Sequence, residues 1–96
     1  MKRIVVLGGG ESGVGAAVLA KDKGFDVFLS DFGTISPKYR EQLERENIPF
    51  EDGGHTDALV LNADEIIKSP GVAPTTPIMV KVLEKGIPVI SEIEFA

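Results

Sequence analysis

The chain has 96 residues, of which 43% are hydrophobic and 26% charged, a composition typical of one small globular domain. The formal net charge of −5, without a cluster of lysine and arginine, argues against a nucleic-acid partner. The absence of cysteine excludes a disulfide scaffold, a thiol nucleophile and a thiolate metal site. No segment has the roughly 20 apolar residues that span a bilayer, and the N-terminus lacks a signal peptide's apolar region. We therefore expect a cytoplasmic protein without membrane insertion.

The first half of the chain predicts two strands, each followed by a helix. Residues 3–7 form a short β-branched run that predicts a buried strand. Residues 13–23 have a helical pattern, with Gly24 placed to end it. A second strand is expected at 26–30, and a helix over the segment PKYREQLERENI, residues 37–48.

The second half repeats this alternation with shorter segments. Strands are expected at 48–50, 65–68 and 88–91, and a further helix at 77–85. Residues 57–61 suit either a brief helix or extended chain. Three residues favour helix N-cap positions: Ser36, Thr56 and Thr76.

This alternation of strands and helices requires crossover connections, and therefore a parallel sheet with right-handed βαβ units. We expect one Rossmann-like α/β domain over residues 1–96, a doubly wound five-stranded sheet in the order 3-2-1-4-5 with helices on both faces. In such sheets the ligand binds beyond the carboxyl ends of the strands, where the strand order reverses. Three loops should meet there: residues 8–15, 31–34 and 69–72.

The first of these loops is rich in glycine. Gly8, Gly10 and Gly13 fit the pattern G-x-G-x-x-G, which permits a tight turn, close approach of backbone to a phosphate, and close packing of helix on sheet. The helix start offers free N–H groups and a positive dipole end to an anion. We expect the backbone of Glu11 and the hydroxyl or N–H of Ser12 to contribute, with the Glu11 carboxylate in solvent. The alternative is a βα turn that needs only small residues.

The other two loops carry polar and aromatic candidates. Asp31 ends the second strand, where an acidic residue accepts hydrogen bonds from a nucleoside, unless it is only a solvated loop residue. Phe32 suits either stacking on a base or filling the core. Ser69, Pro70 and Gly71 form a turn that presents Ser69 to a ligand or serves only as a turn.

Three further residues are weaker candidates. His55 lies in a glycine-rich segment where we expect an exposed turn, and no second histidine or cysteine accompanies it as a metal ligand. Glu92 and Glu94 alternate on the expected last strand, so we expect them to share one face. A solvated face, or one covered by another domain, is the simpler explanation than an acid–base pair.

Together, the motifs resemble the N-terminal domain of the bacterial Mur ligases, most closely the members that add D-glutamate. GGGESGVGAAVLA is similar to that family's G-x-G-x-S-G loop and helix, LSD to its second strand with the nucleotide-reading aspartate, and IIKSPGV to its S-P-G-I element. GIPVISEIEFA is similar to the strand leading toward its central domain. The resemblance covers nearly the whole chain but departs at Phe32-Gly33, where members often carry small polar or basic residues.

The resemblance implies a domain that binds the UDP part of UDP-N-acetylmuramoyl-L-alanine. Backbone N–H groups and the Ser12 hydroxyl would face the diphosphate and uridine, Asp31 would accept a hydrogen bond from the uracil edge, and the Ser-Pro-Gly turn would line the far side. The implied binding residues are Gly10, Glu11, Ser12, Gly13, Asp31, Phe32, Ser69, Pro70 and Gly71.

The family's reaction is ATP-driven amide formation in peptidoglycan synthesis, which serves the cell wall, cell shape and cell division. It needs a G-x-x-G-K-[ST] loop and Mg2+ ligands, and this chain has no Gly-Lys pair. The resemblance therefore implies one domain of a longer three-domain ligase. Such a domain would have no catalytic residue, cofactor or metal of its own and would pack on a central ATPase domain that uses ATP and Mg2+.

Three alternatives stay open on the sequence alone. A nicotinamide-dinucleotide-binding regulatory domain fits the glycine loop and Asp31 but does not require Ser69-Pro70-Gly71. A purely structural domain would show no cavity between the three loops. A different Mur ligase member would keep the same architecture.

Overall fold

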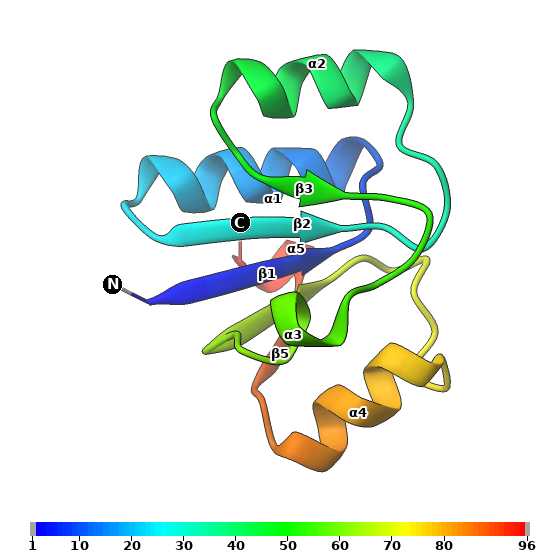
Figure 1. Ribbon diagram of the computed structural model, residues 1–96. Coiled ribbons are helices and arrows are strands. Elements are labelled where there is room, and N and C mark those ends of the chain that lie inside the picture. Colours follow the sequence, from blue (N-terminus) through cyan, green and yellow to red (C-terminus); the bar gives the residue numbers. More distant parts are fainter. Residues whose placement is uncertain (1, 96) are drawn as a thin grey trace.

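A computed structural model describes residues 2–95, so Met1 and Ala96, the ends of the expected domain, lie outside it. Parallel strands form a five-stranded sheet in the order β3-β2-β1-β4-β5, which confirms the expected doubly wound topology (Figure 1). The strands are β1 (Arg3–Leu7), β2 (Asp26–Ser30), β3 (Phe50–Glu51), β4 (Glu65–Lys68) and β5 (Val89–Ser91).

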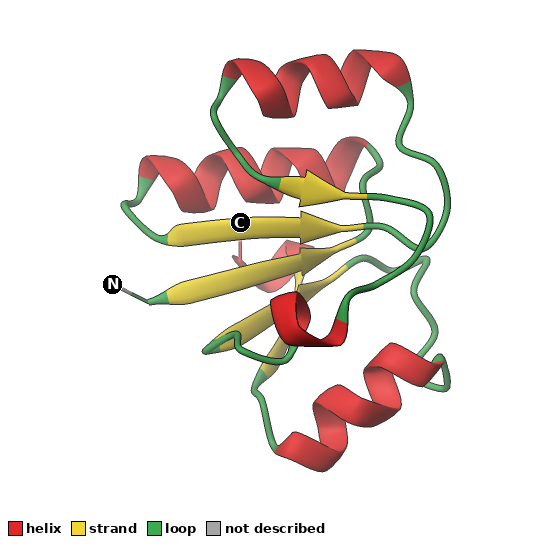
Figure 2. Ribbon diagram, viewed as in Figure 1, coloured by secondary structure: helices red, strands yellow, loops and turns green. Residues whose placement is uncertain are grey.

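Helices cover both faces of this sheet (Figure 2). They are α1 (Glu11–Asp22), α2 (Pro37–Arg45), α3 (Asp57–Val60), α4 (Pro77–Lys85) and α5 (Glu92–Phe95). α1, α2 and α5 lie on one face, and α3 and α4 lie on the other. Because successive strand residues point to opposite faces, Ile4 and Val6 of β1 belong to one buried apolar cluster, and Val5 and Leu7 to the other.

Some element bounds differ from those expected. α1 begins at Glu11 rather than residue 13, because Gly10 already occupies the extended N-cap position. α2 ends before Asn47, whose φ of 58° is incompatible with a continuing helix. β3 and β5 begin one residue after Pro49 and Pro88, since proline has no N–H to donate to a neighbouring strand. The segment with two interpretations forms the short helix α3.

The three expected N-cap positions and the expected end of α4 are correct, but the N-cap side chains do not form the expected hydrogen bonds. Ser36, Thr56 and Thr76 occupy the N-cap positions of α2, α3 and α4, yet none of their side chains makes a capping hydrogen bond. Thr56 Oγ1 instead donates to Glu51 at 2.6 Å. Gly86 ends α4 in the left-handed conformation, as glycine permits.

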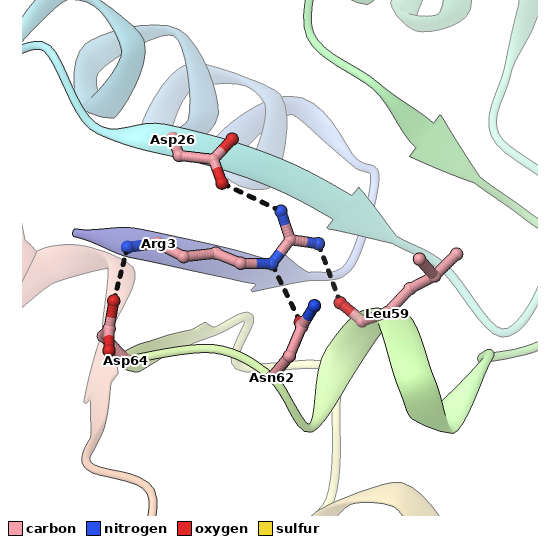
Figure 3. Close-up of polar contacts among 5 residues, drawn as sticks. All are labelled: Arg3, Asp26, Leu59, Asn62 and Asp64. Carbon is pink, nitrogen blue, oxygen red and sulfur yellow. Dashed lines mark hydrogen bonds and ion pairs between the residues drawn. The ribbon is translucent and has the colours of Figure 1, made fainter. Parts of the chain in front are cut away.

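Arg3 joins three segments at the amino end of the sheet (Figure 3). Its guanidinium donates to the Asp26 carboxylate at 3.1 Å, the Asn62 side chain at 2.8 Å and the Leu59 carbonyl at 2.9 Å. Its backbone N–H donates to Asp64 at 2.7 Å. These bonds tie α3 and the segment after it to β1 and β2. These bonds lie at the end of the sheet opposite the expected ligand site, so the role of Arg3 is structural.

α1 packs directly against the end of β1. A Cβ atom at Gly13 would overlap the carbonyl oxygen of Gly8, so a side chain fits there only if the helix moves. Gly8 has a φ of 111°, and a Cβ atom there would lie 2.6 Å from the Ser69 Cβ. The two glycines therefore have the roles expected of the first and third glycines of the loop.

We predict that Gly13→Ala lowers the free energy of unfolding by about 1–3 kcal/mol, because the added methyl group overpacks the contact between α1 and β1. The matched control is Gly15→Ala in the same helix, where a Cβ atom meets nothing within 4 Å. That control should raise the free energy by about 0.5–1 kcal/mol, since alanine favours helix. Urea denaturation followed by circular dichroism measures both. Equal shifts for the two variants would contradict the close packing at Gly13.

Candidate functional site

The loops after β1, β2 and β4 lie together at the carboxyl end of the sheet, on the right of Figure 1. Gly9 donates its N–H to Asp31 Oδ2 at 2.7 Å, which joins the first loop to the second. The contact of Gly8 with Ser69 joins the first loop to the third. Ser69 also donates its N–H to the Leu7 carbonyl at 3.0 Å. The structure thus brings the three loops together, as expected.

A cavity of about 580 Å³ opens between these loops and the start of α4. Pockets for small molecules usually measure about 300–1,000 Å³. The three loops contribute Gly8, Asp31, Phe32, Gly71 and Val72 to its wall. Segments on the α3 and α4 side contribute His55, Asp57, Thr76, Pro77, Ile78 and Lys81. This cavity argues against the purely structural domain.

The start of α1 adjoins the cavity through Gly8, whose carbonyl contacts Gly13. The N–H groups of Glu11, Ser12 and Gly13 have no acceptor among residues 2–95. The side chain of Glu11 is exposed, as expected, and the space where a Cβ atom would point at Gly10 is empty. Free N–H groups at the start of a helix suit an anion.

Asp31 fastens the glycine loop to the end of β2, a role that the sequence reasoning missed. Its Oδ2 accepts the Gly9 N–H at 2.7 Å, and its Oδ1 accepts the Gly33 N–H at 2.8 Å. Each carboxylate oxygen has a second lone pair, so the group is not saturated. The expectation that Asp31 also reads the edge of a base stays a prediction.

Phe32 lines the cavity and is 77% exposed, so the alternative that it fills the core is wrong. Its ring centroid is 6.1 Å from that of His55, and the two rings are tilted by 42°. An exposed phenyl ring beside a cavity offers a face on which a planar ring can stack.

His55 is half-buried and lines the cavity, so the expectation of an exposed turn residue is wrong. Its Nδ1 lies 2.6 Å from Oγ of Ser30, which is fully buried at the end of β2. Ser30 Oγ donates to Glu51 Oε2 at 2.8 Å. Thr56 donates its N–H and its hydroxyl to the same carboxylate, at 2.8 and 2.6 Å. Residues from β2, β3 and the loop before α3 thus form one hydrogen-bonded chain.

In this series of hydrogen-bonded residues, the pKa values of His55 and Glu51 are both lowered. Burial lowers the pKa of His55 below its usual value of 6.5, and the negative charges of Glu51 and Asp31 only partly oppose this. Partial burial acts to raise the pKa of Glu51, but hydrogen bonds from Thr56 and Ser30 outweigh it and lower that pKa below 4.5. At neutral pH, the imidazole of His55 is therefore neutral and Glu51 is a carboxylate.

The turn of Ser69, Pro70 and Gly71 is closed from two sides. Gly71 donates its N–H to Ser69 Oγ at 3.4 Å, and Lys68 Nζ donates to the Val72 carbonyl at 2.9 Å. Gly71 and Val72 belong to the cavity wall, and Ser69 and Pro70 precede them in the same turn.

Asp57 and Lys81 form an ion pair of 2.6 Å at the cavity, and sequence reasoning missed both. One residue starts α3 and the other lies in α4, so no local pattern joins them. Each side chain is about half exposed, at 52% and 48%, so solvent screens the pair and its contribution to stability is small.

Glu92 and Glu94 do not share the face of a strand, because β5 ends at Ser91 and both glutamates belong to α5. Glu92 is only 6% exposed, whereas Glu94 is exposed. Among residues 2–95, Glu92 Oε1 has no hydrogen-bond partner, and a Cβ atom at Gly13 would lie 3.5 Å from it. The positive end of the α1 dipole lies there and offsets part of the cost of burying this group.

Residues 2–95 contain no group of three or more histidine, aspartate or glutamate side chains arranged to bind a metal ion. None of the described helices has both the length and the apolar character required to cross a membrane.

A doubly wound parallel sheet with a glycine-rich turn and a cavity at its switch point defines a Rossmann-like domain. The family model described as "Mur ligase MurD-like, N-terminal domain" matches residues 2–91. The chain therefore belongs to the family of MurD-like N-terminal domains of Mur ligases, which confirms the resemblance drawn from the motifs.

Curated relatives carry the name UDP-N-acetylmuramoylalanine–D-glutamate ligase. The protein from Bacteroides thetaiotaomicron is 58% identical over 96 residues, which are 100% of this chain and 22% of the relative. The protein from Porphyromonas gingivalis strain W83 is 60% identical over 93 residues, or 97% of this chain and 21% of the relative. The chain thus spans about a fifth of the length of these relatives.

Solved structures of other Mur-type ligases have the same fold. A murein peptide ligase from Psychrobacter arcticus superposes with a TM-score of 0.87 at 26% identity, covering 99% of this chain and 20% of that one. A pseudomurein peptide ligase from Methanothermus fervidus superposes with a TM-score of 0.80 at 30% identity, with the same coverage of 99% and 20%.

We predict that the free energy of unfolding falls in two stages as the pH is lowered. The unfolded chain binds a proton at His55 near pH 6.5 while the folded chain resists it, so stability declines below that pH until the lower folded pKa is reached. Below pH 4.5 the unfolded chain binds a proton at Glu51 more readily than the folded chain, and stability falls again.

Urea denaturation at a series of pH values measures this dependence. His55→Phe should flatten the stage near pH 6.5 and leave the acid stage in place. Glu41→Gln, on the exposed side of α2, is the control and should change neither stage. An unchanged first stage in His55→Phe would assign that stage to other groups.

Proposed function

We propose that this chain is the domain that binds UDP-N-acetylmuramoyl-L-alanine in an ATP-dependent ligase that adds D-glutamate during peptidoglycan synthesis. The observation that carries the proposal is the convergence of the glycine loop, the end of β2 and the Ser-Pro-Gly turn on one cavity beside the start of α1. The names of the curated relatives support the choice of substrate and reaction.

The diphosphate is assigned to the start of α1. Free N–H groups of Glu11, Ser12 and Gly13 point out of the first turn, and Ser12 adds a hydroxyl. Peptide dipoles attract an anion there without a basic side chain, which suits a chain whose net charge is −5. Gly10 leaves the approach to these groups open.

The uridine is assigned to the adjoining cavity. Phe32 offers an exposed ring for stacking, and Val72 and Ile78 supply apolar walls. Asp31 and the turn of Ser69, Pro70 and Gly71 border the same space, as the family resemblance implies. The peptide-bearing sugar then extends away from the cavity toward the remainder of the parent enzyme.

ATP and Mg2+ are assigned to that remainder. The chain has no Gly-Lys pair for a phosphate-binding loop, and residues 2–95 hold no cluster of metal ligands, so the residues present do not fit either group. No step of the ligation is assigned to this chain, which is expected to be inactive alone. In the parent enzyme, a cytoplasmic protein in this proposal, it packs on the central ATPase domain and presents the substrate.

We predict that the chain binds UDP and UDP-N-acetylmuramoyl-L-alanine in isothermal titration calorimetry. NAD should bind at least tenfold more weakly, because a polar group of the site that NAD leaves without its hydrogen bond costs about 1–3 kcal/mol of binding free energy. The test separates this proposal from the nicotinamide-binding alternative. Binding of NAD without binding of the UDP ligands would overturn the proposed function.

We predict that Ser12→Asp weakens UDP binding by about tenfold or more, because a carboxylate at the start of α1 repels the diphosphate. Uridine, which has no phosphate, should bind the variant and the wild-type chain with similar affinity. Gln42→Glu in α2 adds a carboxyl group of the same charge elsewhere and serves as the matched control. An equal loss for uridine and UDP would place the diphosphate away from α1.

A further inference from the structure

Glu92 places a carboxyl group beside the first turn of α1. β5 ends at Ser91, level with the last residues of β1 and β4, so Glu92 follows at the carboxyl end of the sheet. Ile90 packs into the apolar cluster on the α1 face, and the side chain of Glu92, two residues further on, reaches the same helix. A Cβ atom at Gly13 would lie 3.5 Å from Glu92 Oε1. The carboxyl group therefore adjoins the helix start to which the diphosphate is assigned.

The described part of the chain does not compensate this carboxyl group. Glu92 is only 6% exposed, and its Oε1 has no hydrogen-bond partner among residues 2–95. None of the ion pairs within residues 2–95 includes Glu92. Lys68, at the end of the neighbouring strand β4, donates its Nζ to the Val72 carbonyl at 2.9 Å instead. Acidic side chains are rarely buried without a partner, which points to a role in the site rather than in folding.

In its ionised form, Glu92 opposes the anion that the helix start attracts. The free N–H groups of Glu11, Ser12 and Gly13 and the helix dipole favour phosphate oxygens. Like charges repel more strongly where protein replaces the water around them, and Glu92 is shielded from solvent. The repulsion grows with the charge of the ligand. The helix start thus combines an attraction for phosphate oxygens with a penalty on the total negative charge.

Uridine diphosphates of two kinds differ in this total charge. In a UDP-sugar each phosphate group is esterified, so the diphosphate carries about two negative charges at neutral pH. In free UDP the terminal phosphate has no sugar and loses a second proton near pH 6, which gives about three negative charges at pH 8. A fixed carboxylate beside the diphosphate therefore repels free UDP more than it repels a UDP-sugar.

We propose that Glu92 is a charge-selecting residue of the site: its buried carboxylate penalises each negative charge at the start of α1, and so favours the diphosphate of a UDP-sugar over the more highly charged free UDP. Glu92 acts through space rather than by contact with the ligand. The inference rests on the proposed function, because it takes a uridine diphosphate to lie at the start of α1.

The test measures a series of ligands of rising charge on Glu92→Gln, which removes the charge and keeps the shape of the side chain. Isothermal titration calorimetry at about pH 8 compares uridine, UDP-glucose and UDP, with EDTA present so that no divalent cation neutralises the phosphates. The variant should bind uridine as the wild-type chain does, UDP-glucose about threefold more tightly and UDP about tenfold more tightly. A structural role would change all three affinities alike, whereas a charge effect follows the charge of the ligand.

Glu94→Gln is the matched control on the same helix. It removes the same charge, but Glu94 is exposed, so water and salt screen its carboxylate. Its affinities for the three ligands should stay within about twofold of the wild-type values, because a screened charge acts weakly at a distance. Equal gains in Glu94→Gln and Glu92→Gln would assign the effect to the net charge of the whole chain and overturn the role of Glu92.

The remaining outcomes separate the inference from the proposed function. If the wild-type chain binds the UDP ligands and Glu92→Gln leaves their affinities unchanged, or weakens them, the role of Glu92 is overturned and the proposed function stands. A loss confined to UDP-glucose would likewise overturn charge selection, because it would make Glu92 an acceptor for the sugar. A wild-type chain that binds NAD but neither UDP nor UDP-glucose would overturn both.

Discussion

The contact between the start of α1 and the end of β1 is the constraint on which the site depends. Gly13 rests on the carbonyl of Gly8, and Gly8 rests on Ser69, so neither position has space for a side chain. The Gly9 N–H then reaches the Asp31 carboxylate. These contacts fix the first turn of α1 beside the cavity, and they leave its N–H groups free because the helix starts at the loop instead of being capped by a side chain.

The charge distribution follows from that arrangement. A chain with a net charge of −5 can take an anionic ligand when backbone dipoles, rather than lysine or arginine, provide the positive potential. The cavity beside the start of α1 has mostly apolar walls. Most of the polar side chains that line it already make hydrogen bonds or ion pairs within the protein. Asp31 and Ser30 use hydrogen bonds within the protein to hold the loops in place.

The amino and carboxyl ends of the sheet have different roles. At the amino end, Arg3 binds α3 and the following segment to β1 and β2 (Figure 3). At the carboxyl end, loops from three crossovers meet, and the N–H groups of Glu11, Ser12 and Gly13 have no acceptor among residues 2–95. In the proposed ligase this separation leaves one rim for the nucleotide, while the reactive end of the substrate extends to the parts of the parent that this chain, about a fifth of the relatives' length, does not include.

The sequence alone determined the strand order, the glycine loop and the three converging loops, because short apolar runs, glycines and prolines act through the backbone within a few residues of themselves. It also carried the family motifs over nearly the whole chain. Only the tertiary structure decided that His55 is half-buried against Ser30, that each oxygen of Asp31 accepts a backbone N–H, and that Glu92 lies in a helix. Each of these depends on contacts between segments from different crossovers, and no local pattern encodes which side chains meet across them.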